Sequence, residues 1–548
     1  MGILVKVFLK IFVSKSTPSR SLAGIAGIVA AATLISKVFG LVRTQAIAAV
    51  FGVGVVADAF NYAYVIPGFL LVLLGGINGP FHSAIVSVLA KRPKSEAAPL
   101  VETVTTFVGG LLLLVTIALI FFAPGIIDLV APGLGTTPHG LEVKAIAVRQ
   151  MRIMAPMALL AGLIGIGFGT LNAANLYWLP SVSPLFSSIT VIIGLGVLAW
   201  QLGAKVTTPQ YAMLGGAVLA WGTLAGAVLQ WLIQVPAQWK SGMGTLRLRF
   251  DFNQPGVKEV TKIMAPATFS SGMSHINLYV ILILASYIPQ AASALQYAGL
   301  LIQTPLGILS NVILVPMLPI FSRLADPQDW DELKGRIRQG LLLTAITMLP
   351  LGAITITLAV PIVRVVYERG AFDRNASQLV SSLLVMYGIG MFVYLGRDVL
   401  IRVFYALGDG DTPFRISMVS IFFNIIFAYV FFKMLGAPGL VLATVVVNII
   451  SMLLLFWMLD RKLHGLPWLE WSLPIFALTG GSFLAGLASW GTLWGIQQFW
   501  HDDGFKEQLV QLTLAGGVGI GVFALIAMQM KLPEVDVFVS RIRQKLGR

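Results

Sequence analysis

The chain has 548 residues, of which 57% are hydrophobic and only 11% are charged. A soluble globular domain carries about 25% charged residues, so this composition excludes a soluble enzyme with a single membrane anchor. The formal net charge of +14 would suggest nucleic acid binding in a soluble protein, but here an excess of cytoplasmic Lys and Arg is the simpler explanation. The absence of cysteine excludes disulfides and thiolate metal sites.

The first twenty residues differ from the rest of the chain. Lys6, Lys10 and Lys15 interrupt a short apolar stretch. A cleaved signal peptide has an uninterrupted apolar core followed by small residues, so this pattern argues against one. We interpret residues 1–20 as a cytoplasmic leader that lies at the membrane surface, with a wrongly assigned start codon as the alternative.

Apolar runs repeat along almost all of the remaining chain, and many exceed the roughly 18 to 20 residues needed to span a bilayer. Short breaks rich in Gly and Pro separate them. The pattern predicts an all-α polytopic membrane protein with about fourteen transmembrane helices and no large soluble domain. The expected helices lie near residues 21–50, 57–90, 97–129, 143–173, 178–203, 209–238, 256–288, 291–322, 334–366, 376–406, 412–434, 438–460, 470–499 and 506–530.

The distribution of basic residues indicates how the chain crosses the membrane. With the N-terminus inside, the inner loops and both termini hold roughly 23 Lys and Arg, against about 6 on the outer side, as the positive-inside rule requires. The opposite orientation would invert this ratio. We therefore expect both termini in the cytoplasm and an even number of spans.

Some basic residues are not explained by orientation, because they lie within or close to the expected spans. Acidic residues there are fewer, chiefly Asp58 and Asp398. A charge at bilayer depth costs at least ~2.5–3.5 kcal/mol, so such a residue usually faces a water-filled cavity or a partner. A cationic internal cavity predicts an anionic substrate. The basic residues are Lys37, Arg43, Arg149, Arg152, Lys262, Arg397, Arg402 and Lys433.

The first expected helix contains Lys37 and Arg43, six residues apart. On a straight helix their side chains project about 120° from each other, and a kink near Gly40 would bring them into one cavity. In the alternative interpretation Lys37 extends to an interface and Arg43 pairs with a carboxylate. We favour the cavity, because Lys37 follows more than about fifteen apolar positions along its helix.

A Gly-rich turn leads into the second expected helix and Asp58. This carboxylate is interpreted either as a cap for that helix or as the counter-ion of Arg43. Gly and Pro then interrupt the span at residues 67–80, as in the bending elements of transporters. Asn78 and His82 are candidate substrate contacts near these breaks. A packing role for His82 is an equal alternative.

Two further candidate sites lie in the second half of the chain. Arg397 and Arg402 are candidate substrate contacts, although the four-residue spacing of Asp398 and Arg402 also favours a structural ion pair that leaves Arg397 free. Asn424 and Thr444 are polar positions in the next two helices and weak candidates for coupling to a cation such as sodium. Hydrogen bonding between helices is the favoured interpretation of both.

Motifs for enzymatic chemistry are missing from the sequence. It has no HExxH, GxSxG or Walker motif and no histidine cluster with metal-ligand spacing. It also has no nucleotide-binding domain, which disfavours an ATP-driven pump. We expect a transporter without a cofactor or resident metal, not an enzyme.

Six stretches carry a resemblance to a known family. They are SKVFGLVR (36–43), FGVGVVADAFNYAYVIP (51–67), GPFHSAIVSVLA (79–90), LNAANLYWLPSVSP (171–184), QTPLGILSNVILVPMLPIFSR (303–323) and RVFYALGDGDTPFRIS (402–417). In these the chain resembles the MurJ (MviN) lipid II flippases, within the multidrug/oligosaccharidyl-lipid/polysaccharide exporter superfamily. The match covers roughly residues 20–465, in order and with typical spacing, and is weaker in the last two expected helices.

The resemblance implies an organisation and a location. Two six-helix lobes, residues 21–240 and 255–465, would form a V around a central cavity. Residues 466–531 would add two helices with a groove for a polyprenyl tail, and residues 532–548 would form a basic cytoplasmic tail. The implied location is the bacterial plasma (inner) membrane.

The resemblance also implies a substrate and partners. The substrate would be lipid II, an undecaprenyl-pyrophosphate that carries a disaccharide-pentapeptide for peptidoglycan synthesis. Membrane lipids and wall-synthesis proteins are the other expected partners, and nucleic acid is not one.

The family pattern is met at some positions and missing at others. Arg43 and Asp58 match the cationic and acidic residues of the family, and Lys37 stands where Arg is usual. The stretch GFLLVLL (68–74) lacks the usual arginine pair, and AGLLIQTP (298–305) lacks the usual Arg and Glu. Two expected pyrophosphate contacts are therefore absent.

These residues support one mechanism and leave alternatives open. Lys37, Arg43 and either Arg397 or Arg402 would donate hydrogen bonds to the pyrophosphate, and alternating access driven by membrane potential or an ion gradient would export it. A related exporter could carry another lipid-linked oligosaccharide. A drug exporter should have an acidic cavity, a scaffold would not need buried cations, and a lipid-carrier enzyme would need a catalytic cluster that the sequence lacks.

Overall fold

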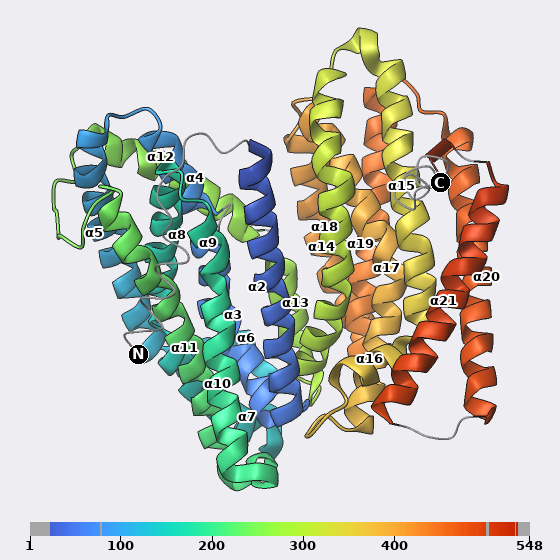
Figure 1. Ribbon diagram of the computed structural model, residues 1–548, viewed down its shortest axis with the longest axis horizontal. Helices are drawn as coiled ribbons and strands as arrows, with labels where there is room; N and C mark the ends of the chain where they lie inside the picture. The colour runs from blue at the N-terminus through green and yellow to red at the C-terminus, as the bar shows by residue number, and fades with distance from the viewer. Residues whose placement is uncertain (1–21, 77–78, 274, 500–503, 532, 535–548) are drawn as a thin grey trace.

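The computed structural model describes residues 22–76, 79–273, 275–499, 504–531 and 533–534, and this part of the chain is helical and contains no strand (Figure 1). The long helices form because apolar runs with few charges satisfy their own backbone hydrogen bonds, as a membrane requires. Proline opens several of them, since its missing N–H is not needed in the first turn.

The first half of the chain contains ten α-helices and two short 3-10 helices within the described residues. They are α2 (Leu22–Phe51), α3 (Val55–Gly75), α4 (Pro80–Leu89), α5 (Lys94–Phe121), α6 (Ala123–Val130), η1 (Pro132–Thr136), α7 (Pro138–Met154), α8 (Met157–Ala173), α9 (Trp178–Val182), α10 (Pro184–Leu202), η2 (Gly203–Thr207) and α11 (Pro209–Lys240).

The second half continues with helices only, among the residues described. They are α12 (Pro255–Met273), α13 (Ile276–Ala285), α14 (Ala291–Arg323), η3 (Pro327–Asp329), α15 (Trp330–Thr357), α16 (Ala359–Tyr367), α17 (Arg374–Ala406), α18 (Asp411–Leu435), α19 (Ala437–Lys462), α20 (Trp468–Phe499) and α21 (Phe505–Gln529).

The structure confirms an all-α chain with many apolar spans but not the expected number of fourteen. Twelve helical segments in the described residues are long and apolar enough to cross a membrane, and the number is thirteen if α7 and α8, bent by 41°, count as one span. The span expected at 256–288 is divided into α12 and α13. Lys258, Glu259 and Lys262 make α12 too polar for a full span, and α13 is too short.

The helices form two bodies, which we call the N-terminal lobe (α2–α11) and the C-terminal lobe (α14–α19), and the two ribbons diverge toward the end where α2 begins (Figure 1). Helix α3 packs on α7 and α8 in the first lobe, and α17 packs on α14, α15 and α19 in the second. Each lobe has its own large apolar core. Helices α20 and α21 pack together beside α15, outside the C-terminal lobe.

The segment that begins the second half crosses from one lobe to the other. Helix α12 packs on α4 and α5 of the N-terminal lobe, while α13 contacts α18 and α19 of the C-terminal lobe. Arg92 reinforces the first contact through an ion pair with Glu259 at 3.3 Å. Helix α13 also contacts α6 and η1 of the N-terminal lobe, so this segment lies between the two lobes, and the boundary expected near residue 255 stays a prediction.

Hydrogen bonds join the lobes at the end where α2 stops and α3 starts, which we call the closed end. Gln45 Nε2 donates to Val366 O at 3.1 Å, and Ala371 N donates to Ala49 O at 2.8 Å. Tyr297 Oη donates to Gly52 O at 2.9 Å and is buried there. Lobe-to-lobe contact is thus made of backbone groups and long side chains at one end of the molecule.

Two glycines allow the backbones to meet at the closed end. Gly52 and Gly370 both have a left-handed φ, +57° and +60°. A Cβ on Gly370 would overlap Ala49 O, and a Cβ on Gly52 would lie 2.5 Å from Ala371 O. Only glycine combines this conformation with so close an approach.

Replacing Gly370 by alanine is therefore expected to weaken the closed end. The left-handed conformation costs an alanine roughly 1–2 kcal/mol, and the overlap with Ala49 O adds to this. The readout is cross-linking of a Gln45→Cys/Val366→Cys pair, which should fall. Gly436→Ala is the matched control, because Gly436 has the same φ sign but no atom within 4 Å of its Cβ position. Equal losses of cross-linking in the two variants would show that backbone strain, and not the overlap with Ala49 O, causes the effect.

The turn between α17 and α18 is fixed by hydrogen bonds that centre on Asp409. Thr412 N and Oγ1 donate to the carboxylate at 3.0 and 2.8 Å, and Lys462 Nζ lies at 2.7 Å. Burial alone would raise the pKa of Asp409, but the hydrogen bonds from Lys462 and Thr412 outweigh it and hold the pKa below its usual value.

This depressed pKa predicts a pH dependence. Because the folded state favours the charged carboxylate, Asp409 adds stability above its unfolded pKa of about 3.9, and loses it as pH falls through the lower folded value. We expect Asp409→Asn to melt below wild type at pH 7, with the gap closing below about pH 4. Thermal unfolding in detergent, followed by tryptophan fluorescence from pH 3 to 8, measures this. A pH-independent gap would contradict the role of the charge.

Candidate substrate site between the lobes

Lys37 lies on α2 where this helix faces the C-terminal lobe. Its Nζ is 3.5 Å from the position that a Cβ on Gly307 of α14 would occupy. The Lys37 side chain is exposed, and within the described residues it has no ion pair. A cation therefore lies between the two lobes, within van der Waals reach of α14 at Gly307.

The face of α14 near Lys37 carries polar side chains that the sequence analysis did not single out as a group. Gln303, Gly307 and Asn311 follow one another at four-residue spacing, and Gln303 and Asn311 are exposed. This spacing places them on one side of the helix. The signal was present in the sequence as a polar stripe on an apolar helix. The stripe and Lys37 form a polar surface shared by both lobes.

Arg43 lies farther along α2, toward the closed end. Its Nε is buried, and no acceptor among the described residues binds it. A buried N–H without a partner costs about 1–3 kcal/mol, so an anionic ligand that accepts from Arg43 would bind favourably. Helix α2 continues as one helix through Gly40, where a kink was considered.

Asp58 does not pair with Arg43, and it does not cap its own helix α3. The buried carboxylate accepts hydrogen bonds from Gln290 N at 2.7 Å, Ser293 N at 2.9 Å and Ser293 Oγ at 2.7 Å. These groups belong to the start of α14 in the other lobe. The expected pair with Arg43 was wrong, and Asp58 lies in the first turn of α3 as an N-terminal anion without a capping bond there. Free N–H groups at a helix N-terminus attract a carboxylate from any element that reaches them. Direct substrate binding by Asp58 stays a prediction.

The residues predicted near the breaks of the second span have different outcomes. Asn78 lies outside the described residues. His82, on α4, is half-buried, and its Nε2 lies 2.7 Å from Asn172 Nδ2 on α8. The His82 Nδ1 and Asn172 Oδ1 atoms are buried and have no partner among the described groups. His82 thus lies in a polar pair within the N-terminal lobe, and Asn172 is the partner that sequence reasoning missed.

Arg397 and Arg402 are both held inside the C-terminal lobe. Arg397 Nε donates to Ser451 Oγ at 2.9 Å, and its Nη2 donates to Ser417 Oγ at 3.3 Å. Arg402 Nη1 donates to Leu314 O on α14 at 3.1 Å. The ion pair expected between Asp398 and Arg402 is not formed, because Arg402 reaches a carbonyl of a neighbouring helix instead. Arg402 therefore holds α14 at the carbonyl of Leu314, within the C-terminal lobe.

The two candidate ion-coupling residues behave differently. Thr444 Oγ1 donates to Leu440 O of its own helix at 3.3 Å, so the expected bond between helices is absent. Asn424 is buried, and neither of its amide atoms has a partner among the described residues. In this part of the chain no three His, Asp or Glu side chains come together as a metal site. Ion coupling stays a prediction.

Comparison with known proteins gives one consistent family. The family model for the lipid II flippase MurJ matches residues 47–530. The chain is 58% identical to a probable lipid II flippase MurJ of Synechocystis sp., over 97% of this chain and 98% of that protein. It is 30% identical to a lipid II flippase MurJ of Burkholderia cenocepacia, over 84% of this chain and 88% of that one.

Solved structures show the same fold at lower identity. A lipid II flippase MurJ in an inward closed conformation matches with a TM-score of 0.72 and 23% identity, covering 95% of this chain and 99% of its own. An inward-facing multidrug transporter of the MATE family, in the MOP superfamily, matches with a TM-score of 0.59 and 15% identity, covering 84% and 98%.

Proposed function

The chain belongs to the MurJ family of lipid II flippases, and on this basis we propose that it moves lipid II from the inner to the outer leaflet of the bacterial plasma membrane. It is a multi-pass membrane protein, as its apolar helices and its relatives show. The proposal rests on the 58% sequence identity to the probable Synechocystis flippase, which extends over 97% of this chain. The named relatives are transporters, so we infer transport and not catalysis for this chain.

The shared polar surface supports recognition of a pyrophosphate. Lys37 offers a point charge and Arg43 a planar pair of donors, which suits two neighbouring phosphate groups. The sugar and peptide would remain in the hydrated space between the lobes, next to the α14 stripe. The polyprenyl tail would stay in hydrocarbon and pass toward α20 and α21.

Contacts at the closed end support alternating access. Hydrogen bonds to the carbonyls of Ala49 and Gly52, and the cap that Asp58 places on α14, join the lobes at the closed end. Export requires these contacts to break while contacts form at the opposite end. We propose that the opposite end and both chain termini lie in the cytoplasm, and the excess of Lys and Arg in the loops expected there supports this orientation.

The membrane potential favours outward movement of the anionic lipid. An inside-negative potential favours outward transfer of an anion by ~2.3 kcal/mol per charge per 100 mV, and it draws an emptied cationic site back inward. Asn424, whose two amide atoms have no partner among the described residues, and Thr444 are the candidates for binding a coupling cation. Wall-synthesis proteins are the proteins we expect to deliver or consume the lipid.

The decisive experiment is rescue of a bacterium depleted of its own lipid II flippase. Lipid II exposed on the cell surface would be measured by cleavage with an enzyme added outside intact cells. Restored exposure supports the proposal. A well-inserted chain that fails to restore it would favour another lipid-linked oligosaccharide, since residues 68–74 lack the arginine pair of the family. Growth without restored exposure would favour a scaffold.

A further inference from the structure

The segment that joins α11 to α12 is fixed against the side of α5, and we call residues 243–252 the connector. Thr245 N donates to Glu102 Oε1 at 2.9 Å, and Arg249 Nε donates to Glu102 Oε2 at 2.8 Å. Arg249 N also donates to Thr106 Oγ1 at 3.0 Å. Glu102 is buried, so these bonds hold the connector at two points on a membrane-spanning helix.

Between and beside these two points the connector exposes its apolar side chains. Leu246, Leu248 and Phe250 are 52%, 74% and 70% exposed, although the residues that alternate with them, Thr245 and Arg249, bind α5. Three large apolar side chains in a row on the outside of a protein mark a surface that something covers. The bonds to Glu102 prevent the connector from turning this face inward.

The neighbouring surface of α5 identifies what covers it. The ring of Phe252 lies 5.7 Å from that of Phe107 on α5, and 6.0 Å from that of Phe250. Phe107 begins a line of exposed apolar residues that continues along the α5 span through Leu111 and Leu114. A span with such a face lies against lipid. The exposed face of the connector is continuous with this lipid-facing surface, on the side of the N-terminal lobe away from the C-terminal lobe (Figure 1).

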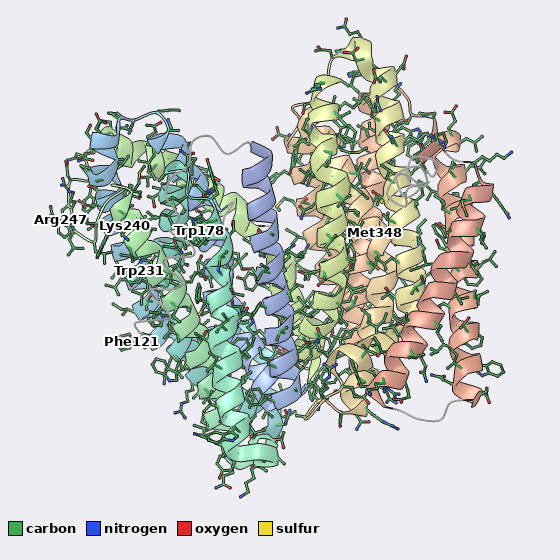
Figure 2. The ribbon with its side chains drawn as sticks, in the orientation of Figure 1. Phe121, Trp178, Trp231, Lys240, Arg247 and Met348 are labelled. Carbon is green, nitrogen blue, oxygen red and sulfur yellow. The ribbon has the colours of Figure 1, made fainter. Side chains whose placement is uncertain are left out.

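The charges of the connector select among lipids. Arg247 is exposed between Leu246 and Leu248, and Lys240 is exposed at the end of α11 next to Trp239. Neither cation has an acidic partner among the described residues, whereas Arg249 is occupied by Glu102. Both lie on the outer edge of the N-terminal lobe (Figure 2). Basic and Trp side chains beside an apolar face are typical of contact with anionic headgroups.

We propose that the connector is a membrane anchor: Leu246, Leu248 and Phe250 insert into the leaflet, and Arg247 with Lys240 binds anionic phospholipid headgroups. Because the connector leads from α11 into the α12–α13 segment that crosses between the lobes, its anchorage fixes the edge of the N-terminal lobe in the leaflet while the C-terminal lobe moves against it. The rate of lobe movement then depends on the anionic lipid content of that leaflet.

The absence of cysteine from the chain allows a direct test by site-directed spin labelling. Single variants from Leu246→Cys to Phe250→Cys would be labelled in vesicles and their accessibility to oxygen and to a water-soluble nickel chelate compared. Labels at 246, 248 and 250 should resemble a lipid control, Leu114→Cys, and the label at 247 should resemble a water control, Gln328→Cys. High nickel access at all five positions would overturn the anchor.

The lipid preference is tested separately with the Leu248→Cys label. In vesicles with phosphatidylglycerol, nickel access should fall about twofold or more relative to phosphatidylcholine alone, and Lys240→Gln with Arg247→Gln should remove the difference. An unchanged value in both lipids would overturn the anionic part of the proposal. The readout requires no transport, so it is independent of the outcome of the rescue experiment.

Discussion

Arg43→Ala is expected to reduce lipid II export by about 10- to 100-fold, because it removes the one donor that the structure shows buried without a partner on α2. A hydrogen bond to a charged group contributes about 1.5–3 kcal/mol, and Arg43 would make it to a pyrophosphate. Surface-exposed lipid II in flippase-depleted cells measures the effect. Arg43→Lys should keep part of the activity, because lysine retains the charge but not the planar donor pair.

The control for this variant is Arg149→Ala, which removes an exposed arginine from α7 of the same lobe. It should export at nearly the wild-type level. Both variants must first be shown to reach the membrane in equal amounts. Wild-type export by Arg43→Ala at matched abundance would refute a role for Arg43 in binding the head group.

Asp58→Ala is expected to lose the closed end and, with it, export. The variant leaves Gln290 N, Ser293 N and Ser293 Oγ without their acceptor at the buried start of α14. We expect a cost of about 2–4 kcal/mol, which shifts the population of the closed state by roughly 30- to 1,000-fold. Cross-linking of the Gln45→Cys/Val366→Cys pair reports the closed state directly.

Two further variants distinguish the loss of a contact between the lobes from a general loss of stability. Ser293→Ala removes only the hydroxyl bond and should give a small part of the effect. Asp128→Asn is the matched control, since Asp128 is a half-exposed carboxylate that pairs with Lys144 on the same lobe. Unchanged cross-linking in Asp58→Ala would mean that the cap on α14 does not hold the lobes together.

The glycine and aspartate variants act on the same contact through different chemistry. Gly370→Ala introduces steric overlap at Ala49 O, while Asp58→Ala removes hydrogen bonds at α14. If the closed end is one cooperative unit, the two effects on cross-linking should be less than additive.

The sequence predicted correctly those features that depend on residues close together along the chain. Mean apolarity over about twenty residues is enough to predict partition into a membrane. Gly and Pro mark many of the breaks between helices, although α14 continues through Pro305, Pro316 and Pro319. The break expected at the glycines of the second span is confirmed by the end of α3 at Gly75 and the start of α4 at Pro80, whereas the break expected at Pro67 was wrong, because α3 continues through this residue. The family could likewise be predicted from short motifs that occur in the expected order along the chain.

The partners of the charged side chains required the tertiary structure. The spacing of Asp398 and Arg402 is that of an ion pair on an isolated helix, but Arg402 binds Leu314 O of α14. Asp58 was expected to interact with its own helix or with Arg43, yet the groups that donate hydrogen bonds to it belong to Gln290 and Ser293. The polar stripe on α14 could be recognised as part of a candidate site only after the structure placed Lys37 of the other lobe beside it.

The sequence by itself determined that this protein is a helical membrane transporter of one family, because hydropathy, turn residues and motifs are local properties. Only the tertiary structure decided which charges are engaged within the protein and which remain available to a ligand. Arg397 and Arg402 are occupied by groups of other helices, whereas Arg43 Nε has no partner among the described residues. The reason is physical: a buried charge binds whatever donor or acceptor the packing brings within about 3 Å, and distance along the chain does not limit that choice.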